Sequence, residues 1–154
     1  ACCLHRLSEQ EVLEGVRFDD AIANGSYRVD VHHSGRPGLT FRYLDGRECY
    51  HDLEPSRPAQ EGRWRPVRDV DPTFYQIPYR CLVPRGSANV LVSGRLIDAD
   101  RGAYGAIRVM LNTNQTGQAA GAAAAIAIQD GCTVDRVDVG RLRDALQAQS
   151  CLIL

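Results

Sequence analysis

The sequence lacks the strongest signals of several protein classes. Its formal net charge is −1, so composition gives no electrostatic reason to expect nucleic acid or an anionic membrane as a partner. Residues 119–128 form an apolar run of only about half the length that a bilayer requires, and no signal peptide is recognisable. Six cysteines occur without any C-x-x-C pair, which argues against a zinc ribbon or a thioredoxin-type motif. We therefore expect free, partly buried thiols and a cytoplasmic protein.

The chain has the size and composition of one globular domain, with 154 residues, 44% of them apolar and 24% charged. Near its start, Ser8 and Glu11 have the spacing of a capping box, which predicts one or two short helices within residues 8–24. Apolar and polar residues then alternate in residues 26–33, and residues 39–45 follow a turn at 34–38. This pattern predicts two half-buried strands.

Regular patterns disappear from residue 46 to residue 72. Four of the seven prolines fall there among many charges (Pro55, Pro58, Pro66 and Pro72). We expect a long irregular connection here, and residues 46–70 are expected to be the most protease-sensitive stretch. Trp64, the only tryptophan, lies within it. It is either an anchor for this loop or a platform for a substrate, and the packing energy of buried aromatics favours the anchor.

The second half of the chain predicts an α/β or α+β fold. Pro78 and Pro84 restrict residues 73–84 to an edge strand or a bulged strand. The apolar run at residues 90–92 is typical of a strand that is buried on both faces, and an alanine-rich helix at residues 112–131 is expected to pack beside it. Asp138 is expected to cap a last amphipathic helix that buries Leu142 and Leu146.

The alanine-rich helix begins with few bulky side chains. Its N-cap is Asn112, Asn114 or Thr116, and the sequence does not choose among them. With Thr116 as the cap, Gly117, Gln118 and Ala119 present the unpaired N–H groups of the helix start, which attract negatively charged ligand atoms. Close packing of alanines against a sheet explains the same composition without a ligand.

Five segments in order point to a family. They are "GVRFDDAIANGSYRVDVHH", "YQIPYRCLVP", "NVLVSGR", "AYGAIRVM" and "TGQAAGAAAAIA". The series resembles the C-terminal part of FAD-dependent oxidoreductases that bind flavin on a two-dinucleotide-fold scaffold of the glutathione-reductase type. The resemblance implies a substrate-domain-like segment at residues 1–87, with its irregular loop at 46–72, and a returning part of the FAD-binding domain at 88–154.

The resemblance also implies roles for single residues. It places Gly94, Arg95, Gly117, Gln118 and Ala119 on the flavin side, and it makes His32 a substrate-side group. Asp98 and Arg101 stand where the family pattern usually has a serine and a histidine.

Other residues are candidates for chemistry on their own properties. Asp30 and His32 share one strand face, so they can form a hydrogen-bonded structural pair, relay a proton or bind a metal. The ligand set for a metal is incomplete, and we expect none. Tyr79, Arg80 and Arg108 are the remaining candidate catalytic residues, because a guanidinium clamps carboxylate or phosphate. Solvated or ion-paired arginines are the alternative.

The motif that holds most of an FAD molecule is missing. No G-x-G-x-x-G occurs in these 154 residues, although the resembled family binds its cofactor chiefly through such a unit. We therefore expect a fragment of a flavoenzyme that acts on a small-molecule substrate. Its missing N-terminal dinucleotide-binding half is its partner, and the full-length parent binds FAD whereas this chain alone does not. The alternative is a non-catalytic fold unit or interaction module.

Overall fold

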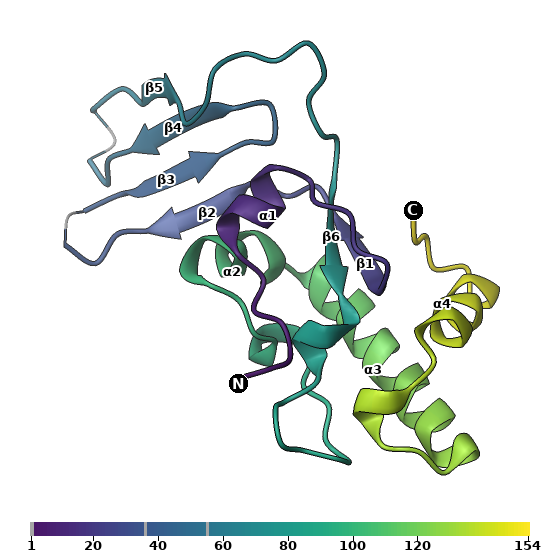
Figure 1. Cartoon of the computed structure of the whole chain (residues 1–154). Coiled ribbons are helices and arrows are strands. Elements are labelled where there is room, and N and C mark those ends of the chain that lie inside the picture. Colours follow the sequence, from purple (N-terminus) through teal and green to yellow (C-terminus); the bar gives the residue numbers. More distant parts are fainter. Residues whose placement is uncertain (1, 36, 55) are drawn as a thin grey trace.

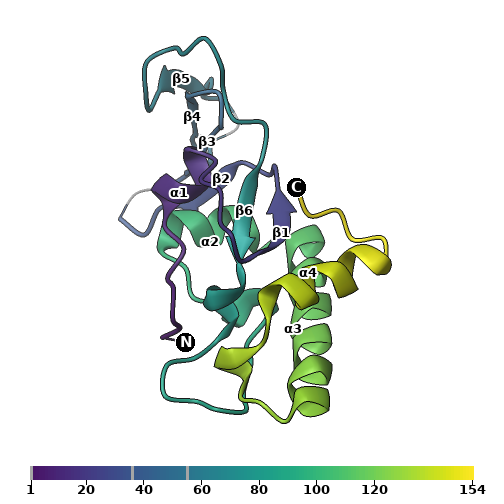
Figure 2. The same ribbon diagram turned by 45° about the vertical axis from the view of Figure 1, so that its right-hand side comes forward.

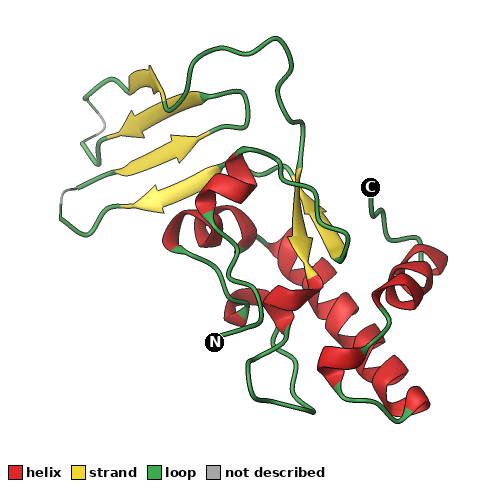
Figure 3. Ribbon diagram, viewed as in Figure 1, coloured by secondary structure: helices red, strands yellow, loops and turns green. Residues whose placement is uncertain are grey.

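The computed structural model describes residues 2–35, 37–54 and 56–154. Within these residues the fold is mixed α/β, with two small antiparallel sheets and helices packed on them (Figures 1 and 3). The helices are α1 (Glu9–Leu13), α2 (Arg101–Ile107), α3 (Met110–Asp130) and α4 (Val139–Ala148), and the 3-10 turns are η1 (Tyr79–Leu82), η2 (Gly94–Leu96) and η3 (Val134–Arg136). The strands are β1 (Ala21–Gly25), β2 (Val29–His32), β3 (Leu39–Arg42), β4 (Arg47–His51), β5 (Gln60–Arg63) and β6 (Tyr75–Pro78).

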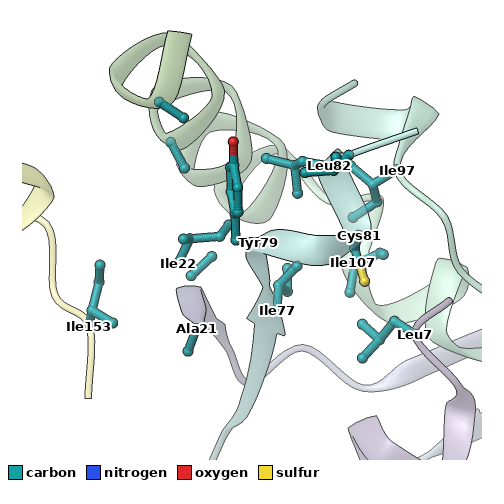
Figure 4. Packing of buried hydrophobic residues seen from close by; sticks show 14 of the residues in the cluster. Leu7, Ala21, Ile22, Ile77, Tyr79, Cys81, Leu82, Ile97, Ile107 and Ile153 are labelled. Carbon is teal, nitrogen blue, oxygen red and sulfur yellow. The ribbon is translucent and has the colours of Figure 1, made fainter. Parts of the chain in front are cut away.

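The two-stranded sheet of β1 and β6 lies at the centre of the core. The strands are antiparallel, with Gly25 opposite Tyr75. Buried side chains from both halves of the chain converge around them, including Ile22, Ile77 and Ile107 (Figure 4). Each strand has a partner on one side only. Pro78, which has no N–H group, is tolerated in such an edge strand. The prediction of an edge strand before Pro84 is confirmed.

The helix predicted within residues 8–24 is shorter than expected. The capping box is confirmed, because the Ser8 side chain accepts from Glu11 N–H while the Glu11 side chain accepts from Ser8 N–H. The helix nevertheless ends at Leu13, and Ala21–Gly25 is strand β1. Pairing with β6 and burial on both faces outweigh the helical preference of residues 21–23.

The four-stranded sheet has the order β2-β3-β4-β5. It lies at one end of the molecule, away from α3 and α4 (Figures 1 and 2). The two strands predicted within residues 26–33 and 39–45 are confirmed as β2 and β3. The prediction that residues 46–72 are irregular is wrong for β4 and β5, because β4 pairs with β3 and β5 pairs with β4. Arg36 of the predicted turn and Pro55 of the predicted loop lie outside the described residues.

Trp64 serves as an anchor. Its Nε1 donates to the carbonyl of Tyr43 at 2.7 Å, and its ring packs against the buried core. This contact fixes the chain after β5 to the turn between β3 and β4.

The predicted buried strand at residues 90–92 is wrong. Those residues form neither helix nor strand, and Val90 is 48% exposed. Val92 N–H donates to the Leu82 carbonyl at 2.9 Å, but neither described sheet pairs with this segment. An apolar run becomes a buried strand only where neighbouring strands cover its backbone groups.

The alanine-rich helix α3 begins earlier than predicted. Its N-cap is Val109, which makes no side-chain capping bond. Asn112 and Thr116 lie inside the helix and are buried; the Asn112 side-chain amide donates to the Tyr75 hydroxyl at 2.9 Å. The small polar residues therefore serve the core and not a cap. The helix ends at Asp130, one residue before the predicted end, and Gly131 caps it with a φ of 61°.

The last helix is confirmed. The Asp138 side chain accepts from Arg141 N–H, and Leu142 and Leu146 are buried.

All six cysteines are free thiols, with Cys3 and Cys81 buried. None of the helices in the described part of the chain is both long and apolar enough to cross a membrane.

Candidate functional site

A hollow of about 210 Å³ lies between β2 and α2. Gly105 permits this arrangement, because a Cβ atom at that position would lie 2.3 Å from the Asp30 carbonyl oxygen. The helix thus rests directly on the backbone of the strand. The hollow is lined by Asp30, Val31, His32, Arg101, Tyr104, Gly105 and Arg108.

Asp30 is the centre of its charged groups. Its side chain is only 13% exposed, and its Oδ2 accepts from Arg108 Nη2 at 2.9 Å. The other oxygen, Oδ1, lies 3.3 Å from His32 Nε2. This contact has an ion-pair distance without the geometry of a hydrogen bond, so Oδ1 has no hydrogen-bond donor among the described residues. Asp30 therefore places a carboxylate beside the imidazole of His32 and binds Arg108 through its other oxygen.

The hollow has a positive balance of charge. Arg101 donates to the His32 carbonyl, and its side chain lies on the same face of α2 as Arg108. Two guanidinium groups thus stand against the single carboxylate of Asp30, with His32 counted as neutral. The His32 side chain is 64% exposed. This arrangement favours an anionic ligand group beside an accessible imidazole.

The start of α3 lies next to this hollow in the chain. Val109 follows Arg108, and the first intrahelical bond runs from Thr113 N–H to the Val109 carbonyl at 3.0 Å. The N–H groups of Met110, Leu111 and Asn112 precede it, and Val109 supplies no side-chain cap. Met110 and Leu111 are 78% and 66% exposed. The positive end of α3 therefore begins with two exposed residues and directly follows Arg108 of the hollow in the chain.

Gly94, Arg95 and Gly117 lie together on an open surface. Gly94 N–H donates to the Thr116 hydroxyl at 3.1 Å, and its φ of +60° suits glycine. A Cβ atom at Gly117 would meet nothing within 4 Å, and Arg95 is exposed. The side of α3 that faces η2 thus carries the short side chains of Thr113 and Thr116, and Gly117 leaves open space next to Thr116.

Gln118 and Ala119 do not share this surface. Gln118 Nε2 donates to the Gln149 side chain at 3.0 Å, and Ala119 is fully buried in the core. Thr116 is not the N-cap, so Gly117, Gln118 and Ala119 do not present the unpaired N–H groups expected with that cap. The helix begins at Met110, so these three residues lie beyond its second turn, where N–H groups bond within the helix.

Tyr79 and Arg80 lie apart from the hollow. Tyr79 is buried, its hydroxyl donates to the Val134 carbonyl at 2.8 Å, and burial raises the pKa of the phenol. Arg80 binds both carboxylate oxygens of Asp20, at 2.9 and 3.0 Å. Of the four candidate catalytic residues, the structure brings only His32 and Arg108 into one hollow.

Sequence reasoning did not assign four residues of the hollow, Val31 on β2 and three residues on α2. Arg101, Tyr104 and Gly105 line it together with Arg108. Their spacing of three, four and seven residues from Arg101 places all four on one face of a helix. This helical periodicity was the signal in the sequence that could have identified these residues as one helix face, to be placed against the strand that holds Asp30 and His32.

A hollow lined by two guanidinium groups, followed in the chain by a helix start without a side-chain cap, suits a negatively charged ligand or cofactor. The model of the family described as FAD dependent oxidoreductase matches residues 2–146. The chain therefore belongs to the FAD-dependent oxidoreductase family. Searches of curated proteins and of solved structures find no match.

Proposed function

We propose that this chain forms the flavin-ring side and the substrate side of an FAD-dependent oxidoreductase of the glutathione-reductase type. When bound, FAD supplies the ring that accepts a hydride from a small-molecule substrate. One observation carries the proposal: the hollow that holds His32 and Arg108 leads within two residues into the uncapped start of α3.

The residues present suit the flavin side. The N–H groups at the start of α3 stabilise negative charge on a ligand, and no side chain caps them in the described residues. Gly94, Arg95 and Gly117 offer a backbone surface that a ring system can approach without steric conflict. Gln118 and Ala119 act indirectly, by fixing α3 against α4 and the core.

On the substrate side, the residues of the hollow bind and orient. Arg101 and Arg108 hold an anionic group of the substrate. His32, which lies beside the carboxylate of Asp30, accepts a proton at its exposed ring nitrogen while the substrate is oxidised. Neither Tyr79 nor Arg80 contacts the substrate in this proposal, because both are engaged elsewhere.

The rest of the cofactor site comes from a dinucleotide-binding unit outside these 154 residues. Exposed apolar side chains at Val90 and Leu96, 48% and 67% accessible, support this proposal, because such residues near an unpaired extended segment are typical of an interface. Six free thiols support a reducing, cytoplasmic location.

The experiment uses the flavoprotein assembled with its dinucleotide-binding unit, with steady-state kinetics on small anionic substrates. Arg108→Met is expected to raise KM about tenfold or more, which corresponds to about 1.4 kcal/mol of binding. His32→Gln is expected to lower kcat by about a hundredfold. Arg136→Met on η3, an exposed arginine outside the hollow, is the matched control. Unchanged kinetics in both site variants would refute the proposed substrate side.

The absorption spectrum of the assembled flavoprotein tests the alternative, a non-catalytic interaction module. The assembled flavoprotein is expected to show the oxidised flavin band near about 450 nm, which is a property of the cofactor. A colourless assembly that binds no FAD would favour the module.

A further inference from the structure

The four-stranded sheet carries a second group of reactive side chains on one face. In its antiparallel register, Phe41 lies opposite Cys49, and Cys49 lies opposite Glu61. His51, two residues after Cys49, shares that face because side chains alternate along a strand. The sheet thus gathers a thiol, an imidazole, an aromatic ring and a carboxylate from three strands.

The thiol and the imidazole are in direct contact. Cys49 Sγ lies 3.2 Å from His51 Nε2. The His51 ring meets the edge of the Phe41 ring, with centroids 5.2 Å apart and planes at 63°. The Arg28 guanidinium lies 3.8 Å from the centroid of the same Phe41 ring. Phe41 therefore orients the imidazole toward the sulfur.

A hollow of about 400 Å³ has Cys49 in its wall. Its charged side chains are Arg47, Arg63, Glu48 and Glu61. Arg47 uses Nε for Asp45, and Arg63 uses Nε and Nη2 for backbone carbonyls, so both keep N–H donors for a ligand. Glu48 is paired with Arg42. The hollow thus presents both signs of charge beside the thiol.

The other cysteines have different surroundings. Burial raises the pKa of the Cys3 and Cys81 thiols. Cys132 and Cys151 pack against the core, and Cys2 is exposed. In the part of the chain that the structure describes, Cys49 is the one thiol in contact with an imidazole.

We propose that Cys49 is a modification site that exchanges with small zwitterionic disulfides, with His51 as the base that takes the thiol proton. The Cys49 sulfur attacks one sulfur of the disulfide, whose S–S bond breaks. A mixed disulfide forms on Cys49, and the released thiolate takes the proton from His51. Cys49 is oxidised, and the released half of the disulfide is reduced, so no other reactant is needed. The site does not involve the start of α3, so it is independent of flavin binding.

The first test measures exchange on the purified protein with glutathione disulfide at pH 7, with each modified cysteine assigned by peptide mass spectrometry. Cys49 is expected to react at least about tenfold faster than Cys2, the exposed internal reference without an imidazole, because an adjacent base activates a nucleophile. Equal rates at Cys49 and Cys2 would overturn the proposal.

His51→Gln tests the base. The exchange rate at Cys49 is expected to fall to that of Cys2 at pH 7 and to approach the unmodified protein's rate above pH ~9, where hydroxide removes the thiol proton instead. If His51→Gln leaves the rate of disulfide exchange at Cys49 unchanged at pH 7, His51 is not the base. His51 is exposed, and far-UV circular dichroism checks that the variant folds.

The ligand class is tested by comparing glutathione disulfide with the neutral 2-hydroxyethyl disulfide. The zwitterionic reagent is expected to react several-fold faster at Cys49 but not at Cys2, and the preference is expected to shrink in Arg63→Gln. A neutral reagent that reacts equally fast at Cys49 would overturn the assigned ligand class.

Discussion

Arg108 Nη2 lies 2.9 Å from Asp30 Oδ2, and this ion pair joins the C-terminal end of α2 to β2. Asp30 is 13% exposed and Arg108 is 35% exposed, so the pair is partly shielded from water. The ion pair fixes one wall of the hollow. It also holds the guanidinium of Arg108, the residue that lies two positions before the start of α3.

Arg108→Met is expected to destabilise the protein. The substitution leaves the buried carboxylate of Asp30 without its cation, which costs about 1–3 kcal/mol of unfolding free energy. Urea unfolding measures the change. The double variant Asp30→Asn with Arg108→Met is expected to be more stable than Arg108→Met alone, because no buried charge then lacks a partner. A double variant that is less stable than both single variants contradicts this account.

Two glycines on helices provide a matched pair for packing. Gly105→Ala places a Cβ atom 2.3 Å from the Asp30 carbonyl, so α2 must move away from β2 at a cost of about 1–3 kcal/mol. Gly117→Ala meets nothing within 4 Å and is expected to stabilise α3 by about 0.5–1 kcal/mol. Thermal unfolding of both variants measures these changes. Equal effects of the two substitutions would show that the close approach of α2 to β2 is unimportant.

Gly117→Val tests the open surface of α3 in the assembled flavoprotein. The branched side chain is expected to weaken flavin binding, because it fills the open space next to Thr116. Gly121→Val is the matched control one turn further along, where a Cβ atom also meets nothing within 4 Å. Flavin fluorescence during titration measures both affinities, and identical losses at the two positions argue against a specific role for Gly117.

The isolated 154-residue chain is expected not to retain FAD. It supplies contacts to the ring side, whereas the adenine, ribose and most pyrophosphate contacts belong to the proposed dinucleotide-binding unit. Loss of several kcal/mol lowers affinity by a factor of about ten for each 1.4 kcal/mol. Titration followed by flavin fluorescence measures binding. Stoichiometric binding at micromolar concentration would show that the chain builds a complete site.

Limited proteolysis tests the segment at residues 46–70. Trypsin is expected to cut first after Arg68, beside Val67 and Val70, which are 75% and 83% exposed; Arg57 and Arg65 precede proline and resist trypsin. Chymotrypsin is expected to cut after Leu53, which is 69% exposed. Arg47 within β4 should stay intact, because it pairs with Arg63 on β5 and its carbonyl accepts from Tyr43 N–H. First cuts inside β4, or outside this segment, contradict the prediction.

Part of the candidate site could be predicted from the sequence. The Asp30 and His32 spacing placed both side chains on one strand face, and Arg108 of the "AYGAIRVM" motif was a candidate clamp for an anionic group. The motif did not reveal that Gly105 brings α2 onto the Asp30 backbone, which is what makes Arg101 and Tyr104 part of the same hollow. The division of the chain at residue 87 stays a prediction, and the core draws side chains from both parts.

The sequence by itself determined the features that depend on neighbouring residues. Ser8 and Asp138 cap their helices, Gly131 ends α3, and alternation produces β2 and β3, because each effect acts within a few residues. Tertiary structure decided the rest. Residues 21–25, 47–51 and 60–63 became strands since partner strands satisfied their backbone groups, while residues 90–92 found no partner. Asn112, a predicted cap, instead donates a buried hydrogen bond to the Tyr75 hydroxyl. A buried polar side chain needs a hydrogen-bond partner, and only the tertiary structure brings Tyr75 within reach.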